Sequence, residues 1–351
     1  MIKHKVLIKE DENLEAAIAG IFQTLGPAKL RKKRILVKPN MLRSANPDDC
    51  VVTDPRLLRA TVDFLLESGA EVVVGDNPMP DSRNMNELEV AQSCGFTDAA
   101  MGRFRNIGRY SKKIVRKANL LKELYISREV LDCDLLVSLP KFKTHELTIM
   151  TIAIKNHFGV IPGGQKLYIH SLFPKINDFS KVLLEIYQTR PPEIIIVDCL
   201  NIVDARGKKF SPGRLIAGDN GHAVDYTCAL MAGVSPYHIP TVRIARDEKI
   251  FSPDNIEYHG VVKNIDGYTL PFTFPLRNTI VELFARFFYQ ILLKRVPVIN
   301  HARCTRCSSC ENVCPPRAIR KQQIDYGACI KCYCCLEICP NQAIRIKYKT
   351  I

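Results

Sequence analysis

Two cysteine-rich runs close to the C-terminus constrain what this chain can fold into more than any other feature of its sequence. Each run has the spacing C-x2-C-x2-C-x3-C and is followed directly by proline, Pro315 in the first and Pro340 in the second. The cysteines are Cys304, Cys307, Cys310 and Cys314 in the first run, and Cys329, Cys332, Cys335 and Cys339 in the second. Three thiolates spaced by two residues can wrap one corner of a metal cubane, so the repeat predicts a small pseudo-twofold module built around metal.

This spacing is typical of bacterial ferredoxins, in which the fourth cysteine of each run ligates the cluster of the other run. We therefore expect two 4Fe-4S clusters. Cluster 1 is assigned to Cys304, Cys307, Cys310 and Cys339, and cluster 2 to Cys329, Cys332, Cys335 and Cys314. A pair of structural zinc sites is the alternative, but zinc ribbons use separated C-x2-C pairs rather than tandem runs closed by proline. Cys334 takes the position that Ser309 holds in the first run, so we expect a spectator thiol and not a ninth ligand.

The rest of the chain is too long to be an appendage of this module. The full chain has 351 residues, of which a two-cluster module needs roughly the last fifty. The remainder can bury a full core, in one domain or two lobes. We expect an α/β domain over 1–250, a linker and packing helix over 251–299, and the ferredoxin module over 300–351. The apolar residues that share one face of the packing helix are Ile280, Leu283, Phe284, Phe287, Phe288 and Ile291; partner docking by that helix is the alternative.

The net charge of the chain limits which classes of partner are expected. The formal net charge is +14, from 50 Lys and Arg against 36 Asp and Glu. Two oxidised clusters with their thiolates carry about −2 each, which leaves about +10. The surplus favours an acidic redox partner protein or an anionic small-molecule substrate. Nucleic acid is disfavoured, because the basic residues are interleaved with acidic ones and no nucleic-acid-binding motif is present.

The chain is expected to be a cytoplasmic protein. Charges at Lys5, Lys9 and Glu10 interrupt the N-terminus, which does not resemble a signal peptide, and no segment is long and apolar enough for a membrane span. Outside the two runs, the other cysteines show no pairing pattern and are expected to be small core residues in a reducing compartment. They are Cys50, Cys94, Cys133, Cys199 and Cys228.

Apolar runs alternate with helical patterns along most of the chain. This rhythm predicts an α/β fold with a mostly parallel sheet and crossover helices, followed by a small ferredoxin-like α+β module. Strands are expected at 6–9, 35–40, 71–77, 134–141, 193–198, 215–219 and 242–247. Helices are expected at 13–25, 55–68, around 147–157, near 175–188 and at 223–231. Residues 79–128 are expected to be mainly solvated excursions.

Several of the predicted strands end in polar side chains. These are Lys38 and Asn40, Asp76 and Asn77, Lys141 and Lys143, Asp198, and Asp219. Exposure of strand ends would explain any one of them. Because ligands of parallel α/β sheets bind beyond the carboxyl ends of the strands, the recurrence of polar residues at these ends predicts a shared polar cleft.

The densest polar segment is 140–170. It holds Lys141, Lys143, His145, Lys155, Asn156, His157, Lys166 and His170 beside a turn with Gly159, Gly163 and Gly164. Lysine charges and flexible backbone N–H groups suit a carboxylate or phosphate. Neither G-K-[ST] nor G-x-G-x-x-G is present where nucleotide binding would need it. His145 suits proton transfer or the start of a helix, and a metal site from His157, His170 and Asp198 is a less favoured reading.

Six segments resemble the domain-of-unknown-function family 362. They are ILVKPN at 35–40, TDPRLLRA at 53–60, VVVGDNP at 72–78, LPKFKTH at 139–145, AIKNHFGVIPGGQK at 153–166 and LIAGD at 215–219. Members of this family often carry a C-terminal two-cluster ferredoxin module, and their broad architecture is similar to that of nickel-pincer lactate racemases. The site residues that the resemblance implies are Lys38, Asn40, Asp76, Lys141, Lys143, His145, Lys155, Asn156 and Asp198. The acidic residue and Gly-x-Gly-Pro turn that commonly follow the 194–198 strand are absent, with Asp204 a weak substitute.

The favoured interpretation is an iron–sulfur oxidoreductase, in which two clusters relay electrons to an anionic small molecule in the α/β domain. One alternative is a non-redox isomerase or racemase-like enzyme with an accessory ferredoxin module. The other is an electron carrier whose large domain only docks partners. A flavin or an additional metal in the cleft stays open.

Overall fold

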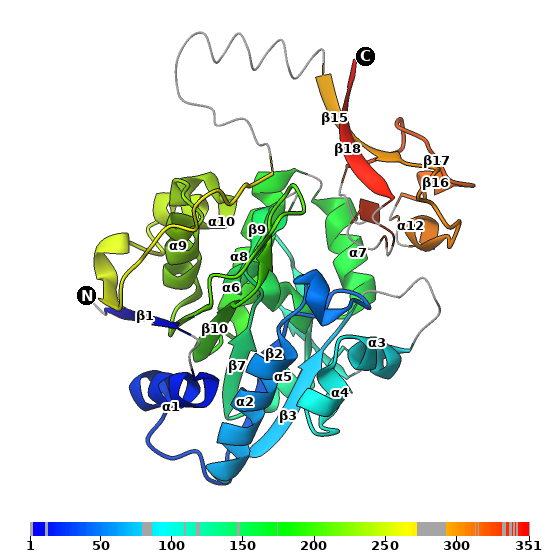
Figure 1. The fold of residues 1–351 in the computed structure, drawn as a ribbon. Helices are drawn as coiled ribbons and strands as arrows, with labels where there is room; N and C mark the ends of the chain where they lie inside the picture. The colour runs from blue at the N-terminus through cyan, green and yellow to red at the C-terminus, as the bar shows by residue number, and fades with distance from the viewer. Residues whose placement is uncertain are drawn as a thin grey trace.

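The computed structural model describes residues 3–10, 13–78, 86–108, 110–116, 120–145, 148–173, 175–271, 293–312, 314, 316–331, 335–336, 339, 341 and 343–350. Its body is an eight-stranded sheet with the order β14-β1-β13-β10-β7-β2-β3-β4 (Figure 1). The strands are β1 (His4–Glu10), β2 (Arg34–Pro39), β3 (Glu71–Asp76), β4 (Phe104–Asn106), β7 (Leu135–Leu139), β10 (Ile194–Cys199), β13 (Arg214–Gly218) and β14 (Ile256–His259).

Most of the sheet is parallel, which confirms the predicted fold class. The pairs β10–β7, β7–β2, β2–β3, β3–β4 and β1–β14 are parallel. Among the described strands of this sheet, only β13 is antiparallel to its neighbours, β1 and β10. From β2 the chain proceeds outward to β3 and β4 and then returns to place β7 on the other side of β2. The carboxyl ends of β2 and β7 therefore meet at the point where the strand order reverses, where open α/β sheets bind ligands.

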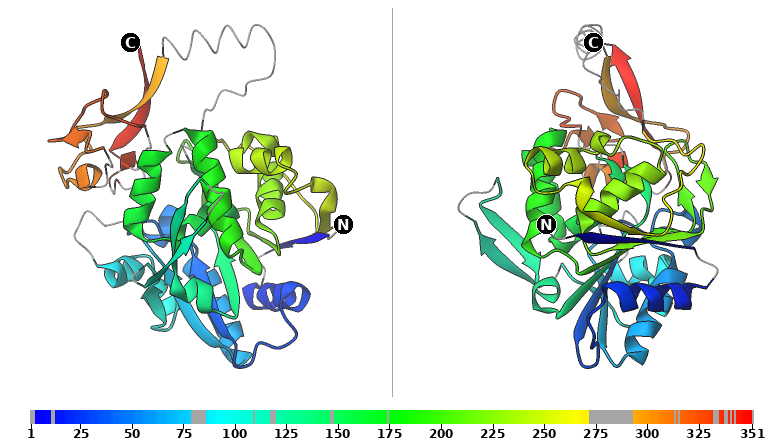
Figure 2. Two further views of the ribbon diagram at one scale, coloured as in Figure 1. Left: turned by 180° about the vertical axis from the view of Figure 1, so that it is seen from behind. Right: turned by 90° about the vertical axis from the view of Figure 1, so that its left-hand side faces the viewer.

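Helices cover both faces of the sheet (Figures 1 and 2). The longer ones are α1 (Leu14–Leu25), α2 (Pro55–Glu67), α3 (Glu87–Ser93), α7 (Gly163–Leu172), α8 (Ile176–Thr189), α9 (Gly221–Met231) and α10 (Pro240–Asp247). The short ones are α4 (Phe96–Ala99), α5 (Arg128–Asp132), α6 (Ala153–Asn156) and α12 (Ser309–Asn312), with 3-10 turns η1 (Pro47–Asp49), η2 (His157–Val160), η3 (Pro236–His238) and η4 (Pro253–Asn255).

The pleat of the strands explains the two layers. Ile35 and Val37 of β2 point to one face and pack with α1 to α4, whereas Leu36 points to the other and packs with α5, α7 and α8. Alternate residues of β10 do the same, since Ile196 joins the first layer and Ile195 packs with α9 and α10. Strands buried on both faces read as continuous apolar runs, and this is why the sequence predicts them well.

The N-terminal caps follow the sequence signals. The side chain of Asn13 accepts a hydrogen bond from Ala16 N at the start of α1, and that of Asp54 accepts one from Arg56 N where Pro55 begins α2. An acceptor side chain at this position satisfies one of the backbone N–H groups that lack a helical partner. The five scattered cysteines are all buried, as expected of core residues.

Two element predictions are wrong. The predicted strand 242–247 is helix α10, because Pro240 sits in its first turn and Val242 and Ala245, three residues apart, are both buried on one helical face. The predicted helix around 147–157 is strand β9 (Ile149–Thr151) followed by α6 and η2; β9 pairs with β8 (Lys143–His145). Ile149 has φ of 70°, a left-handed conformation that a helix does not allow.

Residues 79–128 are more regular than predicted. Their described part contains α3, α4, β4 and a hairpin of β5 (Ser111–Val115) and β6 (Glu123–Ser127). In β6 the buried Leu124 and Ile126 alternate with the exposed Glu123 and Tyr125, whereas β5 exposes Lys112, Lys113 and Val115. A further small hairpin joins β11 (Ile202–Val203) and β12 (Lys209–Phe210).

The C-terminal module is formed by two strand pairs around the cysteine runs. Strand β15 (Leu293–Ile299) pairs with β18 (Ile344–Thr350), and β16 (Ile319–Arg320) pairs with β17 (Gln323–Ile324). The module lies beside α7 in the views of Figures 1 and 2. The predicted packing helix at 280–291 lies outside the described residues. Among the helices that the structure describes, none has the length and apolar character that crossing a membrane would require.

Candidate functional site

A cavity of about 820 Å³ opens at the carboxyl ends of β2 and β7. Its walls come from the segments that follow β2, β3 and β7, from α6, η2 and α7, from 203–207 and 269–271, and from the ferredoxin module. Seven of the nine predicted site residues line it: Lys38, Asn40, Asp76, Lys143, His145, Lys155 and Asn156. The sheet's reversal point therefore gathers side chains that are far apart in the sequence.

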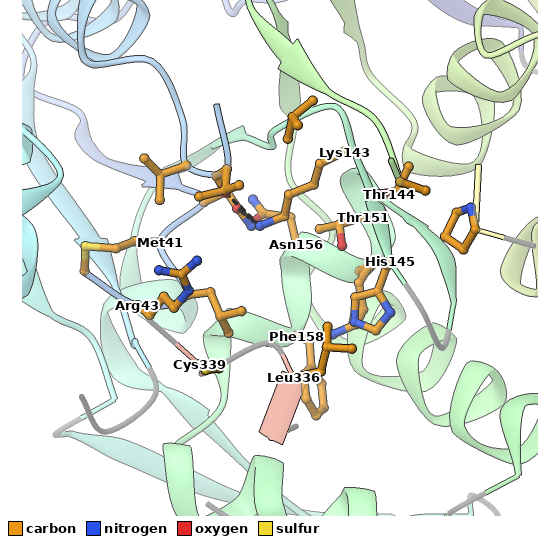
Figure 3. A pocket seen from close by; sticks show the side chains of 18 of the residues that line it. Met41, Arg43, Lys143, Thr144, His145, Thr151, Asn156, Phe158, Leu336 and Cys339 are labelled. Atoms are coloured by element: carbon orange, nitrogen blue, oxygen red, sulfur yellow. Dashed lines mark hydrogen bonds between the residues drawn. The ribbon is translucent and has the colours of Figure 1, made fainter. Parts of the chain in front are cut away.

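An amide network crosses the floor of the cavity. Asn40 Nδ2 donates to Asn156 Oδ1 at 2.9 Å, and Asn156 Nδ2 donates to Ser138 Oγ at 3.1 Å. Lys143 Nζ donates to Asn40 Oδ1 and to the carbonyl oxygen of Val51, both at 2.8 Å. Figure 3 shows Lys143 directed toward Asn156 across this floor. The linked hydrogen bonds fix the direction in which each amide presents its donor and acceptor to a bound molecule.

Lys38 and Asp76 form a buried ion pair beneath this floor. Lys38 Nζ lies 2.9 Å from Asp76 Oδ1, and the two side chains are almost completely buried. The carboxylate also accepts hydrogen bonds from Met41 N and Asn77 N. Gly159 of η2 lies directly against the pair, since a Cβ there would be 2.5 Å from Lys38 Nζ. The glycine of the AIKN-x-FG motif is therefore needed for close approach.

Lys141 and Asp198 belong to the supporting structure and do not line the cavity. Lys141 Nζ lies 2.7 Å from Asp198 Oδ2, with both side chains buried. Asp198 also accepts hydrogen bonds from Asp54 N at 2.6 Å and from Leu200 N at 3.1 Å. The pair ties the end of β7 to the end of β10 and to the start of α2, so it positions the segment that carries Lys143.

His145 and Lys155 complete the predicted set. His145 Nδ1 accepts a hydrogen bond from Thr148 N at 3.1 Å, which fixes the ring at the cavity wall where Figure 3 shows it. Lys155 Nζ lies 4.9 Å from the ring centroid of Phe158 and 5.7 Å from that of Phe179. A cation over aromatic faces is held in place by its attraction to the rings.

The histidines do not form a metal site. His157 is fully buried behind the cavity, in edge contact with Tyr187, and burial together with nearby Lys38 lowers its pKa to about 3. His170 lines the cavity and stacks on Phe179. Within the described ranges, no group of three or more His, Cys, Asp or Glu side chains is arranged to hold a single metal ion.

Several lining residues were absent from the predicted set. They are Arg43, Lys166, Asp204, Arg206, Arg303 and Arg345. Asp204, the suspected substitute for the missing acidic residue, does reach the cavity, but its Oδ1 accepts hydrogen bonds from Arg206 N and Lys208 N and so shapes a turn. Nothing in the sequence indicates that Arg303 and Arg345 line the same cavity as Lys38, because this depends on how the module docks.

The ferredoxin module forms part of the cavity wall. Leu336, Cys339 and residues 344–346 line the cavity together with residues of the α/β domain. Leu336 and Ile346 pack against the apolar cluster that contains Phe158 and Phe179. In Figure 3, Leu336 and Cys339 lie on the side of the cavity opposite Lys143.

A second, smaller cavity lies inside the module. Cys304, Cys307, Cys310 and Cys339 all line it. Burial raises the pKa of the Cys310 thiol to about 11, and the thiols of the other three add to this effect. A bound cluster would reverse the shift, because metal ligation deprotonates a thiol. These four donors around one cavity fit a 4Fe-4S group. Cys332, predicted to ligate cluster 2, lies outside the described residues.

Backbone N–H groups point at two of the sulfurs in equivalent positions. Ala318 N donates to Cys314 Sγ and Ala343 N donates to Cys339 Sγ, each at 3.2 Å and each four residues after its cysteine. Hydrogen bonds to ligand sulfurs stabilise thiolate charge and help to set cluster potential. The repetition matches the pseudo-twofold character of the two runs.

Comparison with known families finds a match in each of the two parts of the chain. The profile of a family described as a domain of unknown function (DUF362) matches residues 35–230, more than half of the chain and all nine predicted site residues of the α/β domain. The chain belongs to the DUF362 family. A 4Fe-4S binding domain profile matches residues 297–320, so this DUF362 protein carries an iron–sulfur domain.

The similarity to individual proteins is partial. A thylakoid-associated protein of Synechocystis sp. is 28% identical over 279 residues, which cover 72% of this chain and 84% of that protein. The lactate racemase apoprotein of Thermoanaerobacterium thermosaccharolyticum is 15% identical with a TM-score of 0.45, covering 66% of this chain. A Thermotoga maritima protein is 13% identical with a TM-score of 0.39, covering 64%. This chain spans 58% and 59% of those two structures' own lengths.

Proposed function

We propose that this protein carries two 4Fe-4S clusters and passes electrons through them to an anionic small molecule bound in the 820 Å³ cavity. The observation that supports this most is the position of Cys339. It lines the substrate-sized cavity and also the small cavity that holds Cys304, Cys307 and Cys310. Cluster 1 would therefore be the donor next to the substrate, and cluster 2 would receive electrons from a redox partner.

The charge of the cavity supports an anionic substrate. Its lining includes Lys38, Arg43, Lys143, Lys155, Lys166, Arg206, Arg303 and Arg345, against the carboxylates of Asp76 and Asp204. Asp76 is already paired with Lys38, and Asp204 is used within its own turn. Positive charge in a partly enclosed site attracts carboxylate or phosphate and strengthens its binding.

A fixed arrangement of donor and substrate site would also account for the fusion of both parts in one chain. Holding the donor against the cavity removes the cost of an encounter between two molecules at each transfer. We place this activity in the cytoplasm, where thiols outside the clusters stay reduced.

The test is an anaerobic reoxidation assay. Protein is reduced with dithionite, freed of excess reductant, and mixed with a panel of anionic oxidants: 2-oxo acids, carboxylates conjugated to a C=C bond, and aromatic N-oxides carrying a carboxylate. The clusters' visible absorbance reports reoxidation. We expect at least one class to accelerate it at low concentration, with saturation.

Variants make the assay specific to the cavity. Lys143→Met should slow reoxidation at least tenfold, and Cys339→Ser should abolish it although cluster 2 is still reduced. Lys113→Met, at an exposed residue paired with Glu123 on the β5–β6 hairpin, should react at the native rate. The proposal fails if no compound saturates, or if Lys143→Met and Lys113→Met react alike. A catalytic rate that does not depend on the oxidation state of the clusters would instead favour the isomerase alternative.

A further inference from the structure

Lys166 is the lysine of the cavity that the predicted site did not include. It lies on α7, the helix beside the ferredoxin module in Figures 1 and 2, and lines the cavity together with Cys339. Only 6% of the residue is exposed. Its Nζ donates a hydrogen bond to the carbonyl oxygen of Asn77 at 2.5 Å, which directs the amine toward the end of β3. No described carboxylate forms an ion pair with it.

The charges around Lys166 come from three other elements. Lys38 of β2 and Lys155 of α6 oppose its protonation, and Asp76 of β3 favours it. Asp76 has the largest of these charge effects, and its oxygens also accept hydrogen bonds from Met41 N and Asn77 N and pair with Lys38 Nζ. Burial is the largest effect, and the sum lowers the pKa of Lys166 to about 7. A lysine in such a setting can exchange a proton near neutral pH, which an exposed lysine cannot.

We propose that Lys166 is the proton-transfer residue of this cavity, binding a proton when the adjoining cluster is reduced and giving it to the bound substrate. The inference rests on the proposed function, because it assigns the proton that must accompany the electrons. Negative charge brought into a buried site favours protonation of a nearby amine, so electron and proton arrival are linked.

The balance of the step is as follows for an unsaturated substrate X. X takes up two electrons, one at a time, and two protons to give XH2. The electrons come from a reduced electron-carrier protein by way of the clusters. One proton leaves Lys166 Nζ, which becomes a neutral amine and is reprotonated from solvent; the other comes from solvent directly.

Other titratable groups face the same cavity and must be separated from Lys166. His170 lies one turn further along α7, and His145 lies on the wall formed by β8. Arg206, Arg303 and Arg345 also line the cavity, but guanidinium groups do not lose protons in proteins. A redox-linked proton carried by a histidine would survive removal of Lys166, so substitution of this one residue distinguishes the cases.

The experiment is a potentiometric titration of the anaerobic holoprotein from pH 6 to 9, followed by EPR, without added substrate. We expect the potential of one cluster to fall as pH rises through the pKa range of Lys166. In Lys166→Met that dependence should disappear. Lys166→Arg keeps a charged donor for Asn77 O but cannot deprotonate, so it should also show a flat profile. Lys181→Met, at an exposed residue paired with Glu248, is the matched control and should keep the native slope.

A second readout measures the amine itself. Trace labelling with acetic anhydride at several pH values, mapped by mass spectrometry, gives the fraction of neutral amine at each lysine. Lys166 should titrate near neutral pH. A native potential that does not change with pH, a slope retained in Lys166→Met, or an ordinary titration of Lys166 would each overturn the proposal. None of these results depends on whether a substrate is found, so the reoxidation assay can fail separately.

Discussion

Cys339 and Asn156 line the same cavity, although one comes from the ferredoxin module and the other from the AIKN segment of the α/β domain. Figure 3 shows them on different sides of that space. The cysteine also lines the small cavity with Cys304, Cys307 and Cys310. A proposed cluster ligand and an amide of the predicted site thus line one cavity, and the proposed electron transfer depends on that arrangement.

Gly159 should be intolerant of a side chain. In Gly159→Ala the new Cβ would lie 2.5 Å from Lys38 Nζ and 2.6 Å from Asp76 Oδ1. Because both groups are buried and bonded, we expect a loss of about 1–3 kcal/mol in the free energy of unfolding, as for overpacking. Urea unfolding under anaerobic conditions measures it. Gly163→Ala, with no atom within 4 Å of its added Cβ, is the control and should be close to native.

The Lys141–Asp198 pair should act on stability more than on chemistry. Asp198→Leu leaves a buried ammonium and the N–H groups of Asp54 and Leu200 without their acceptor, at a cost of about 3–5 kcal/mol. Lys141→Met should cost less, since the carboxylate keeps those two donors. The double variant should cost less than the two single losses added together. Equal and additive losses would mean that the two side chains do not interact.

Asp225 should make stability depend on pH. This carboxyl is buried beneath α6 and accepts a hydrogen bond from Ala153 N at 2.8 Å; burial raises its pKa to about 7. Its folded pKa is above the unfolded value of about 3.9, so its contribution is complete below that value and is lost as pH rises through about 7. Asp225→Asn keeps an oxygen acceptor but does not titrate.

The native-minus-variant difference in unfolding free energy should therefore fall by about 2 kcal/mol between pH 5.5 and 7.5. Urea unfolding of both proteins at matched pH values gives this difference, and effects of acid on the clusters cancel between them. A difference that stays constant with pH would show that Asp225 is ionised throughout.

Cys334 should be dispensable for iron binding. Cys334 holds the position in the second run that Ser309 holds in the first. Ser309 is buried beside Cys307, with its Oγ 3.3 Å from that sulfur. Cys334→Ser should therefore keep the full iron content, whereas Cys304→Ser should lose one cluster. Iron and acid-labile sulfide analysis checks both. Equal losses in the two variants would make Cys334 a ligand.

Much of the α/β domain could be predicted from sequence because its central strands are buried on both faces. Runs such as those of β2, β7 and β10 are apolar throughout, and the helices between them have clear caps. The direction of β13 could not be predicted, since an apolar run looks the same whichever way it pairs. The segment that contains β9 and α6 was mispredicted because tertiary contacts determine its conformation. Asp225 accepts a hydrogen bond from Ala153 N, and Ile149 adopts a left-handed conformation.

The candidate site could be predicted only in part. Strand-end residues such as Lys38 and Asn40 were found because parallel strands bring their carboxyl ends together. Lys141 and Asp198 follow the same rule but turn toward each other, a choice that depends on side-chain packing. Lys166 lies in the polar segment 140–170, which the sequence already indicates for an anion, whereas Arg345 reaches the cavity through the placement of the module, which no local pattern encodes.

The most direct test of the central claim is the iron and acid-labile sulfide content of the anaerobically purified protein, measured together with EPR of the reduced state. Two cubanes predict about eight irons and about eight sulfides per chain, with magnetic interaction between two reduced clusters. Cys339→Ser should retain about half of the iron and lose that interaction. Native protein with about four irons or fewer would contradict the account, and so would a Cys339→Ser variant with the same spectrum as native.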